Sequence, residues 1–263
     1  VLENVAGAIT SRSGKDFAAI CHALAEEGYR FGALTIDAIH FVPQSRPRLF
    51  FVAVDEHADL PATLVKADAN PLWCSDARKK KKKRLSGAAA RQWVWWNLPV
   101  PTTRNYGLGD LVESHPNGCE WHSVAETDKL LSLMAPLHLA KIEQARASGQ
   151  KLVGAVYKRT RADGNGIKRQ RAEVRFDDIA GCLRTPGGGS SRQLILVVEG
   201  ASIGSRLLSP REAARLMGLP DDYVLPPRYN DAYHVAGDGV CVPAVRFLAE
   251  NLLEPLTDRH ASV

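Results

Sequence analysis

Long apolar runs are missing from this sequence. The longest, LFFVAV at residues 49–54, is far shorter than the about 20 residues that a membrane-spanning helix needs. Cysteine is sparse as well: the five cysteines are scattered, and none forms the CxxC spacing typical of zinc sites. These absences argue against a membrane partner and against a metal site, and unpaired thiols favour a reducing, cytoplasmic location.

Excess charge of one sign is also missing once a single segment is set aside. The net charge is +5, but RKKKKKR at residues 78–84 carries +7, so the remaining residues sum to −2. A lysine run of this kind typically forms a solvated loop, and the alternative is a non-specific, salt-sensitive phosphate contact. Global charge therefore indicates no function. With 45% apolar and 24% charged residues, the 263-residue chain is composed like an ordinary globular protein of one or two domains.

The pattern of apolar residues near the start predicts an α/β arrangement. Apolar side chains at helical spacing predict a helix over residues 17–26, with Gly28 as its end. Two β-rich stretches follow, at residues 31–41 and 49–54. The link VPQSRPR between them is short, so we expect the two strands to be antiparallel neighbours. The opening VLENV reads as the end of a buried strand that carries Glu3.

The middle of the chain has a less regular pattern of apolar residues than the start. Residues 55–122 show little periodicity, and the cluster of Trp93, Trp95 and Trp96 is more typical of a core than of a stacking surface. A capping box of Ser123 and Glu126 opens a helix over residues 123–149, which Pro136 should interrupt. Further strands are predicted at residues 151–161, 167–176 and 193–200, the first two forming a basic hairpin around the turn ADGNG.

Two helices are predicted towards the end of the chain. Ser209 and Glu212 form a capping box around Pro210, and Gly218 ends this helix within residues 206–220. A glycine turn then leads into an apolar helix within residues 237–256.

Four of these segments, taken in order, resemble motifs of the DNA cytosine-C5 methyltransferase family. ENV at residues 3–5 resembles motif VI, PQSRPR (43–48) motif VIII, RLLSPREAARLMGLPDDY (206–223) motif IX, and GDGV (237–240) motif X. The resemblance implies the C-terminal part of a doubly wound, Rossmann-like sheet that uses S-adenosyl-L-methionine. Catalytic segments at residues 1–54 and 206–263 would flank an inserted, mostly β or irregular target-recognition domain at residues 55–205. It further implies a prokaryotic or phage-encoded enzyme of the restriction-modification kind.

Some features of the family are not found in the sequence. None of the five cysteines follows a proline, whereas the family's nucleophile lies in a Pro-Cys pair, and no Gly-rich cofactor loop opens the chain. Motif X carries Asp238 where the family usually has Asn. The resemblance therefore predicts that an N-terminal half, in cis or as a separate subunit, supplies the nucleophile and most of the cofactor pocket. The chain alone is predicted to be inactive.

The resemblance assigns catalytic roles to three residues. Glu3 would sit beside N3 of a cytosine flipped out of duplex DNA, where burial would let its carboxyl group hold a proton and make the ring electron-poor. Arg48 would contact the pyrimidine O2 and a nearby phosphate, because a guanidinium group bonds such oxygens directionally. Arg46 would brace the catalytic loop and the cofactor side. Asp238, Gly239 and Val240 would lie beside S-adenosyl-L-methionine.

We predict that the basic hairpin and the segment that follows it contact double-stranded DNA. The alternative is that the hairpin is an ordinary charged, solvent-exposed sheet face. The motif IX residues Arg211, Glu212 and Arg215 would join the recognition region to the catalytic sheet. Gln44, besides contacting DNA, would order the turn in which it lies. A non-catalytic, sequence-specific DNA-binding protein is the second possible function, but such a protein has no use for Glu3, Arg46 and Arg48 together. The residues predicted to contact DNA are Gln44, Arg159, Arg161, Arg169, Arg171, Arg184, Ser190, Ser191 and Arg192.

Overall fold

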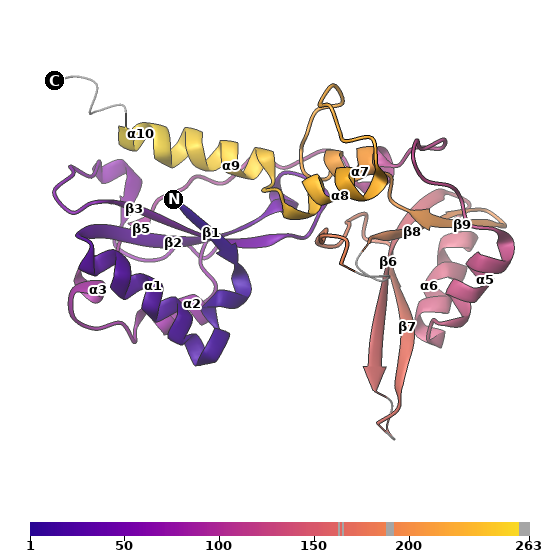
Figure 1. The fold of residues 1–263 in the computed structure, drawn as a ribbon, viewed down its shortest axis with the longest axis horizontal. Helices are drawn as coiled ribbons and strands as arrows, with labels where there is room; N and C mark the ends of the chain where they lie inside the picture. The colour runs from indigo at the N-terminus through magenta and orange to yellow at the C-terminus, as the bar shows by residue number, and fades with distance from the viewer. Residues whose placement is uncertain (163, 165, 188–191, 258–263) are drawn as a thin grey trace. The chain divides into compact units, whose positions relative to one another are not determined.

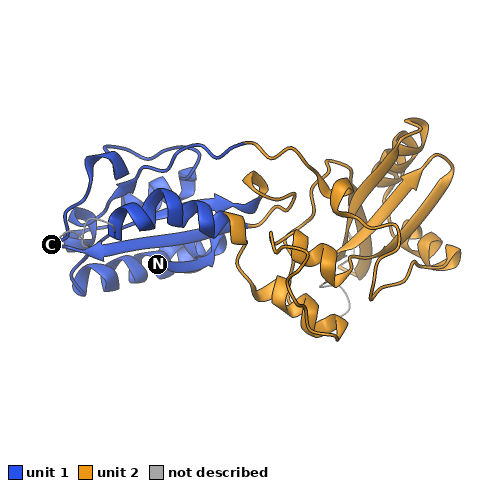
Figure 2. Cartoon of the chain, turned by 90° about the horizontal axis from the view of Figure 1, so that it is seen from above, with its two compact units in different colours: residues 1–38, 47–102, 244–263 blue, residues 39–46, 103–243 orange. Residues whose placement is uncertain are grey.

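The computed structural model describes residues 1–162, 164, 166–187 and 192–257, which form a mixed α/β structure. The chain divides into two compact units, coloured separately in Figure 2. Unit 1 comprises residues 1–38, 47–102 and 244–263, and unit 2 comprises residues 39–46 and 103–243. The predicted functional boundaries, after residues 54 and 205, do not coincide with these packing boundaries. They stay a prediction, because packing alone does not define function.

Unit 1 is built on a three-stranded antiparallel sheet in the order β1-β3-β2. The strands are β1 (Leu2–Val5), β2 (Tyr29–Asp37) and β3 (Pro47–Asp55). The predicted antiparallel pairing of β2 and β3 is confirmed. The predicted end of β2 at residue 41 is wrong, because the chain turns into the 3-10 helix η3 (Ala38–His40) after Asp37. Short 3-10 helices η1 (Ala6–Ile9) and η2 (Ser11–Gly14) follow β1.

Helix α1 (Lys15–Glu26) covers one face of this sheet. Its apolar positions bury Phe17 and Cys21, and the Phe17 ring centroid lies 5.5 Å from that of Phe51 on β3. Gly28 ends the helical segment with φ +75°, a conformation that glycine adopts without strain. The predicted helix and its glycine stop are both confirmed. Figure 1 shows α1 and α9 on opposite sides of the sheet.

The tryptophan cluster belongs to the core of unit 1, as predicted. Trp93 and Trp96 are buried, and Trp73 packs its ring 5.8 Å from that of Phe247 on α9. The remaining elements of unit 1, with α9 crossing the boundary to unit 2, are η4 (Ala62–Leu64), β4 (Val65–Lys66), α2 (Asp76–Lys82), α3 (Gly87–Arg91), β5 (Trp95–Trp96), α9 (Val242–Leu248), the π-helix η5 (Ala249–Leu253) and α10 (Glu254–Thr257).

The lysine run forms a helix, so the prediction of a solvated loop is wrong. Ser75 caps α2 by accepting a hydrogen bond from the Arg78 backbone N–H. Arg78 is only 1% exposed and donates to Cys74 Sγ at 3.2 Å and Thr35 Oγ1 at 3.3 Å. This buried side chain anchors the helix to the sheet, and the lysines lie near the helix C-terminus, where cations are favourable.

Unit 2 is built on a four-stranded antiparallel sheet in the order β7-β6-β8-β9. Helices α5 (Val124–Ser132) and α6 (Pro136–Ala147) pack on it, and Pro136 opens the second helix as predicted. The prediction missed the last strand, whose Gly204 and Ser205 weaken the sequence signal. The strands are β6 (Lys151–Ala162), β7 (Lys168–Arg175), β8 (Leu194–Glu199) and β9 (Ser202–Leu207).

Three further helices complete unit 2: α4 (Leu108–Leu111), α7 (Pro210–Arg215) and α8 (Tyr229–Asp238). The capping box of Ser209 and Glu212 is present at α7 as predicted. Helix α8 was not predicted, although its buried Ala232, Tyr233 and Ala236 have helical spacing. No helix in the described part of the chain is long and apolar enough to cross a membrane.

Candidate functional site

Glu3 and Arg48 form an ion pair on the sheet of unit 1. The register sets Glu3 opposite Phe50, which places Arg48 diagonally across from Glu3 on the same face. Arg48 Nε lies 2.9 Å from Glu3 Oε1, and the two side chains are 18% and 31% exposed. The expected burial of Glu3 is therefore wrong: its carboxyl group is partly open and is held by a guanidinium group. Both groups can still reach a ligand.

Strand β1, which carries Glu3, is an edge strand. The sheet order leaves one side of β1 without a neighbouring strand in the described part of the chain, and Leu2 and Val5 are exposed. An unpaired strand edge offers a row of backbone N–H and C=O groups to a further strand. Asn4 bonds locally: its Oδ1 accepts from the Val5 backbone N–H at 2.8 Å.

Arg46 is buried in unit 2 and braces three backbone carbonyl groups. Its Nη1 donates to Leu183 O at 2.9 Å, and its Nη2 donates to Gly237 O at 3.0 Å and to Gly239 O at 2.7 Å. The bonds to Gly237 and Gly239 hold the segment that the motif resemblance assigns to the cofactor side. Its catalytic role stays a prediction.

Gln44 orders the same part of unit 2, and the structure corrects its predicted contact with DNA. The residue is completely buried. Its Nε2 donates to Leu216 O at 2.7 Å, and its Oε1 accepts from the Leu183 backbone N–H at 3.0 Å. Since both ends of the amide are used inside the protein, the role of Gln44 is structural. The other part of its prediction, ordering the turn, stays a prediction.

The GDGV segment links the end of α8 to the start of α9. Gly237 has no room for a side chain, because an added Cβ would lie 2.6 Å from the Thr185 backbone nitrogen. Asp238 accepts a hydrogen bond from Thr185 Oγ1, yet its side chain is 66% exposed. Val240 is exposed too. An open carboxylate and an apolar side chain beside a braced turn fit the edge of a polar organic cofactor.

The basic hairpin carries opposed arginines along one face. The register pairs Arg159 with Arg171 and the Cα of Arg161 with that of Arg169. Arg159 Nε lies 3.6 Å from Glu173 Oε2, and its guanidinium group lies over the Tyr157 ring. Arg171 is exposed and has no ion-pair partner among the described residues. The opposite face, with Val156, packs on the helices. Like charges directly opposite one another are unfavourable unless an anion neutralises them.

The segment after the hairpin is only partly described. Arg184 is exposed, and Arg192 is engaged by α8, where it donates to Asn230 and stacks over the Tyr229 ring at 5.6 Å. The predicted contacts of Ser190 and Ser191, together with the side chain of Arg161, lie outside the described part of the structure.

Sequence reasoning missed the partner of Glu212. Arg206 and Glu212 form a completely buried ion pair with Nη–Oε distances of 2.6 and 2.7 Å. Arg215 binds Asp221 at 2.7 Å and Glu113 at 2.9 Å, all within unit 2. Arg211 donates to two backbone carbonyls, Pro220 O and Tyr223 O. Motif IX thus ties together parts of unit 2.

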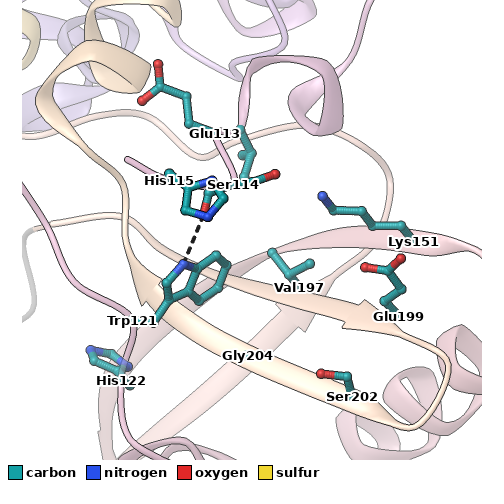
Figure 3. A pocket seen from close by; sticks show the side chains of 11 residues that line it. Glu113, Ser114, His115, Trp121, His122, Lys151, Val197, Glu199, Ser202 and Gly204 are labelled. Atoms are coloured by element: carbon teal, nitrogen blue, oxygen red, sulfur yellow. Dashed lines mark hydrogen bonds between the residues drawn. The ribbon is translucent and has the colours of Figure 1, made fainter. Parts of the chain in front are cut away.

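A hollow of about 390 Å³ lies on the sheet of unit 2, and none of the predicted site residues lines it (Figure 3). Trp121 lies over Gly204 on β9 and donates from Nε1 to Ser114 O at 3.3 Å. Lys151 and Glu199, from neighbouring strands, contribute opposite charges. In the part of the chain that is described, His, Cys, Asp and Glu side chains form no group of three or more that could hold a metal ion.

Comparisons with known proteins give the family. The family model described as C-5 cytosine-specific DNA methylase matches residues 1–254, so the chain belongs to this family. Type II methyltransferase M.NlaX of Neisseria lactamica is 23% identical over 263 residues, which cover 98% of this chain and 64% of that protein. Type II methyltransferase M1.ScrFI of Lactococcus lactis subsp. cremoris is 24% identical, with coverages of 97% and 51%. The chain thus spans about half to two thirds of these relatives.

Among solved structures, that of S. pombe Dnmt2 methyltransferase matches with a TM-score of 0.44 and 16% identity, covering 97% of this chain and 65% of that one.

Proposed function

We propose that this member of the C-5 cytosine-specific DNA methylase family forms part of the catalytic site of a DNA (cytosine-5-)-methyltransferase. Its substrate is a cytosine flipped out of a specific duplex sequence. The observation that carries the proposal is the ion pair of Glu3 and Arg48 on one face of the unit 1 sheet. The family match over residues 1–254 supplies the reaction class.

Glu3 and Arg48 act on the pyrimidine ring in this proposal. The Glu3 carboxyl group shares a proton with cytosine N3 when the base is bound, and this hydrogen bond draws electrons from the ring and favours nucleophilic addition. Arg48 orients that carboxyl group through the 2.9 Å contact, and its guanidinium group has the geometry to bind the pyrimidine O2 or a phosphate. When bound, S-adenosyl-L-methionine supplies the methyl group, and Asp238 and Val240 would line the edge of its site.

The nucleophilic thiolate comes from a further segment, in cis or as a separate chain. None of the five cysteines follows a proline. Burial raises the pKa of Cys21 to about 12, so that thiol stays protonated near neutral pH. Burial likewise raises the pKa of Cys119. The free edge of β1 is a suitable place for strands of the complementing segment to pair.

The 263-residue chain alone should transfer no methyl groups to DNA. Complementation by a segment with a Pro-Cys pair and a cofactor loop, taken from a type II relative, should restore transfer. The measurement is the incorporation of labelled methyl groups from S-adenosyl-L-methionine into a pool of duplex DNA. The same segment with Cys replaced by Ser is the control and should be inactive. Methyl transfer by the chain alone would refute this division of labour, and sequence-specific binding without transfer after complementation would favour a binding protein.

We further propose that the arginine face of the hairpin contacts the DNA. Arg159 on β6 and Arg171 on β7 lie opposite one another, and the phosphate backbone is an anion that relieves their repulsion. Arg171 is the best placed, because it is exposed and has no ion-pair partner among the described residues. Phosphate contacts position the protein, and contacts with base edges give specificity.

Replacing Arg171 with Ser should weaken DNA binding by the complemented enzyme more than replacing Lys80 on α2. In this proposal Arg171 contacts a base edge, so its loss should cost about 1–3 kcal/mol of discrimination at one position of the recognised site. A Lys80→Ser variant should lose affinity equally on all sequences, and the loss should shrink as salt rises. Titrations of single-base variants of the site at two salt concentrations measure both effects. A neutral Arg171→Ser variant, alongside altered sequence preference in Lys80→Ser, would show that the hairpin is not the reading surface.

A further inference from the structure

Unit 1 contains a second hollow, whose residues take no part in the proposed methyl transfer. It has a volume of about 510 Å³, within the range of small-molecule sites. Part of its lining comes from β2, the region of β4, α2 and the segment that leads into β5. The lining residues used below are Arg30, Lys66, Lys82, Arg91, Gln92, Trp93 and Trp95.

The charge of this hollow has one sign. Arg30, Lys66, Lys82 and Arg91 line it, and no Asp or Glu is among its lining residues. The nearby carboxylate of Glu56 accepts a hydrogen bond from Gln92 Nε2 at 2.7 Å. Gathering four cations around one concave surface is unfavourable in the absence of an anion. The hollow is therefore suited to a negatively charged ligand.

Buried polar atoms along the hollow lack partners in the described part of the chain. Trp93 is 9% exposed, and its Nε1–H makes no hydrogen bond, although its ring packs edge-on against Phe31. Arg30 donates from one Nη to Ala58 O, but its Nε–H is unsatisfied. Gln92 Oε1 is also without a partner. Two buried donors and a buried acceptor thus lie unpaired beside the cations, and such groups are rarely left unpaired in folded proteins.

An aromatic ring lies next to these charges. Trp95 is half-buried, and the Lys82 ammonium group lies 5.8 Å from the centroid of its ring. Trp93 fixes the Trp95 ring by an edge-on contact at 5.2 Å. A braced indole ring offers a face on which a nucleobase of any kind can stack, while adjacent cations bind a phosphate.

We propose that this hollow binds a nucleoside phosphate. The phosphate binds among the cations of Lys82, Arg91 and Arg30, and the base stacks on Trp95. The same chemistry is found in a free mononucleotide and in a nucleotide unit of single-stranded DNA. The site is independent of Glu3 and of the hairpin, so failure of the methyl-transfer proposal leaves this one untouched. It also gives a specific role to part of the lysine-rich helix α2.

The test is calorimetric titration of the 263-residue chain with dAMP, inorganic phosphate and a short oligodeoxyadenylate. These probes carry no cytosine. The doubly substituted variant Lys82→Glu, Arg91→Glu should weaken dAMP binding about tenfold or more. The matched control Lys80→Glu, Arg84→Glu makes the same charge change at exposed residues that do not line the hollow, and it should change the affinity by less than about twofold. Trp95→Leu should weaken dAMP binding about fivefold or more and leave phosphate binding nearly unchanged.

Three results would overturn the proposal. They are an equal loss in the control variant, an equal effect of Trp95→Leu on phosphate and dAMP, and the absence of dAMP and oligonucleotide binding by the unchanged chain. If the oligonucleotide binds more tightly than dAMP and competes with it, single-stranded DNA is the ligand. If dAMP binds and the oligonucleotide does not, a free nucleotide is the ligand.

Discussion

Replacing Glu3 with Gln is expected to lower the methyl-transfer rate of the complemented enzyme by about 100- to 10,000-fold, the usual contribution of an acid or base catalyst. Gln has nearly the shape of Glu but cannot deliver a proton to cytosine N3. DNA affinity should change little, because in the proposed complex the hairpin and other phosphate contacts supply most of it. Single-turnover rates measure the first effect, and equilibrium titration with duplex DNA measures the second.

Glu27→Gln is the matched control for this variant. Glu27 lies at the end of α1 in the same unit, is exposed, and undergoes the same chemical change. Its rate should equal that of the unsubstituted enzyme. The methyl-transfer rate of Arg48→Lys should lie between those of Glu3→Gln and Glu27→Gln. Lysine keeps the charge but lacks the Nε donor that holds Glu3 at 2.9 Å. Full activity of Glu3→Gln would remove Glu3 from the chemistry.

The second large effect is expected on stability, at the buried pair of Arg206 and Glu212. Arg206→Met leaves the Glu212 carboxylate without its guanidinium partner at a position that is 0% exposed. Breaking a buried pair in this way costs about 3–5 kcal/mol of unfolding free energy. Urea denaturation followed by circular dichroism measures the change.

A surface pair provides the comparison for this variant. Arg146 and Glu143 lie 3.1 Å apart on α6 and are 39% and 66% exposed, so Arg146→Met should cost less than about 1 kcal/mol. The double variant Arg206→Met, Glu212→Leu should regain much of the lost stability, because it leaves no unpaired charge. A stability loss in Arg206→Met no larger than in Arg146→Met would contradict the structural role of the pair.

The elements that could be predicted from sequence are those with local signals. Ser123, Ser209 and Gly28 mark helix ends through bonds or backbone angles that involve only neighbouring residues, and each was placed correctly. The lysine run was misread because its decisive contact is not local. Arg78 is buried against Thr35 and Cys74, and nothing in the sequence distinguishes that one cation from its neighbours.

In the candidate site, too, features with local sequence signals could be predicted and long-range contacts could not. The motif resemblance identified Glu3 and Arg48, and the strand register then set them on one face. The motif resemblance did not reveal that both ends of the Gln44 amide are bonded inside unit 2. The bonding partners, Leu183 and Leu216, are distant from Gln44 in sequence. Burial of Glu3 was expected from the chemistry, whereas the structure pairs it with Arg48 and leaves it partly open.

The guanidinium group of Arg46 can couple the binding of one ligand to the binding of another. It holds Leu183 O, next to the exposed Arg184, and it also holds the carbonyls of Gly237 and Gly239 that flank Asp238. A ligand that displaces residue 183 therefore strains the bonds to the 237–239 turn. By thermodynamic reciprocity, a ligand bound at that turn must change affinity at Arg184 by the same factor. If DNA binds at Arg184 and the cofactor at Asp238, as predicted, one buried side chain makes the two binding events mutually dependent, so that each ligand reports on the presence of the other.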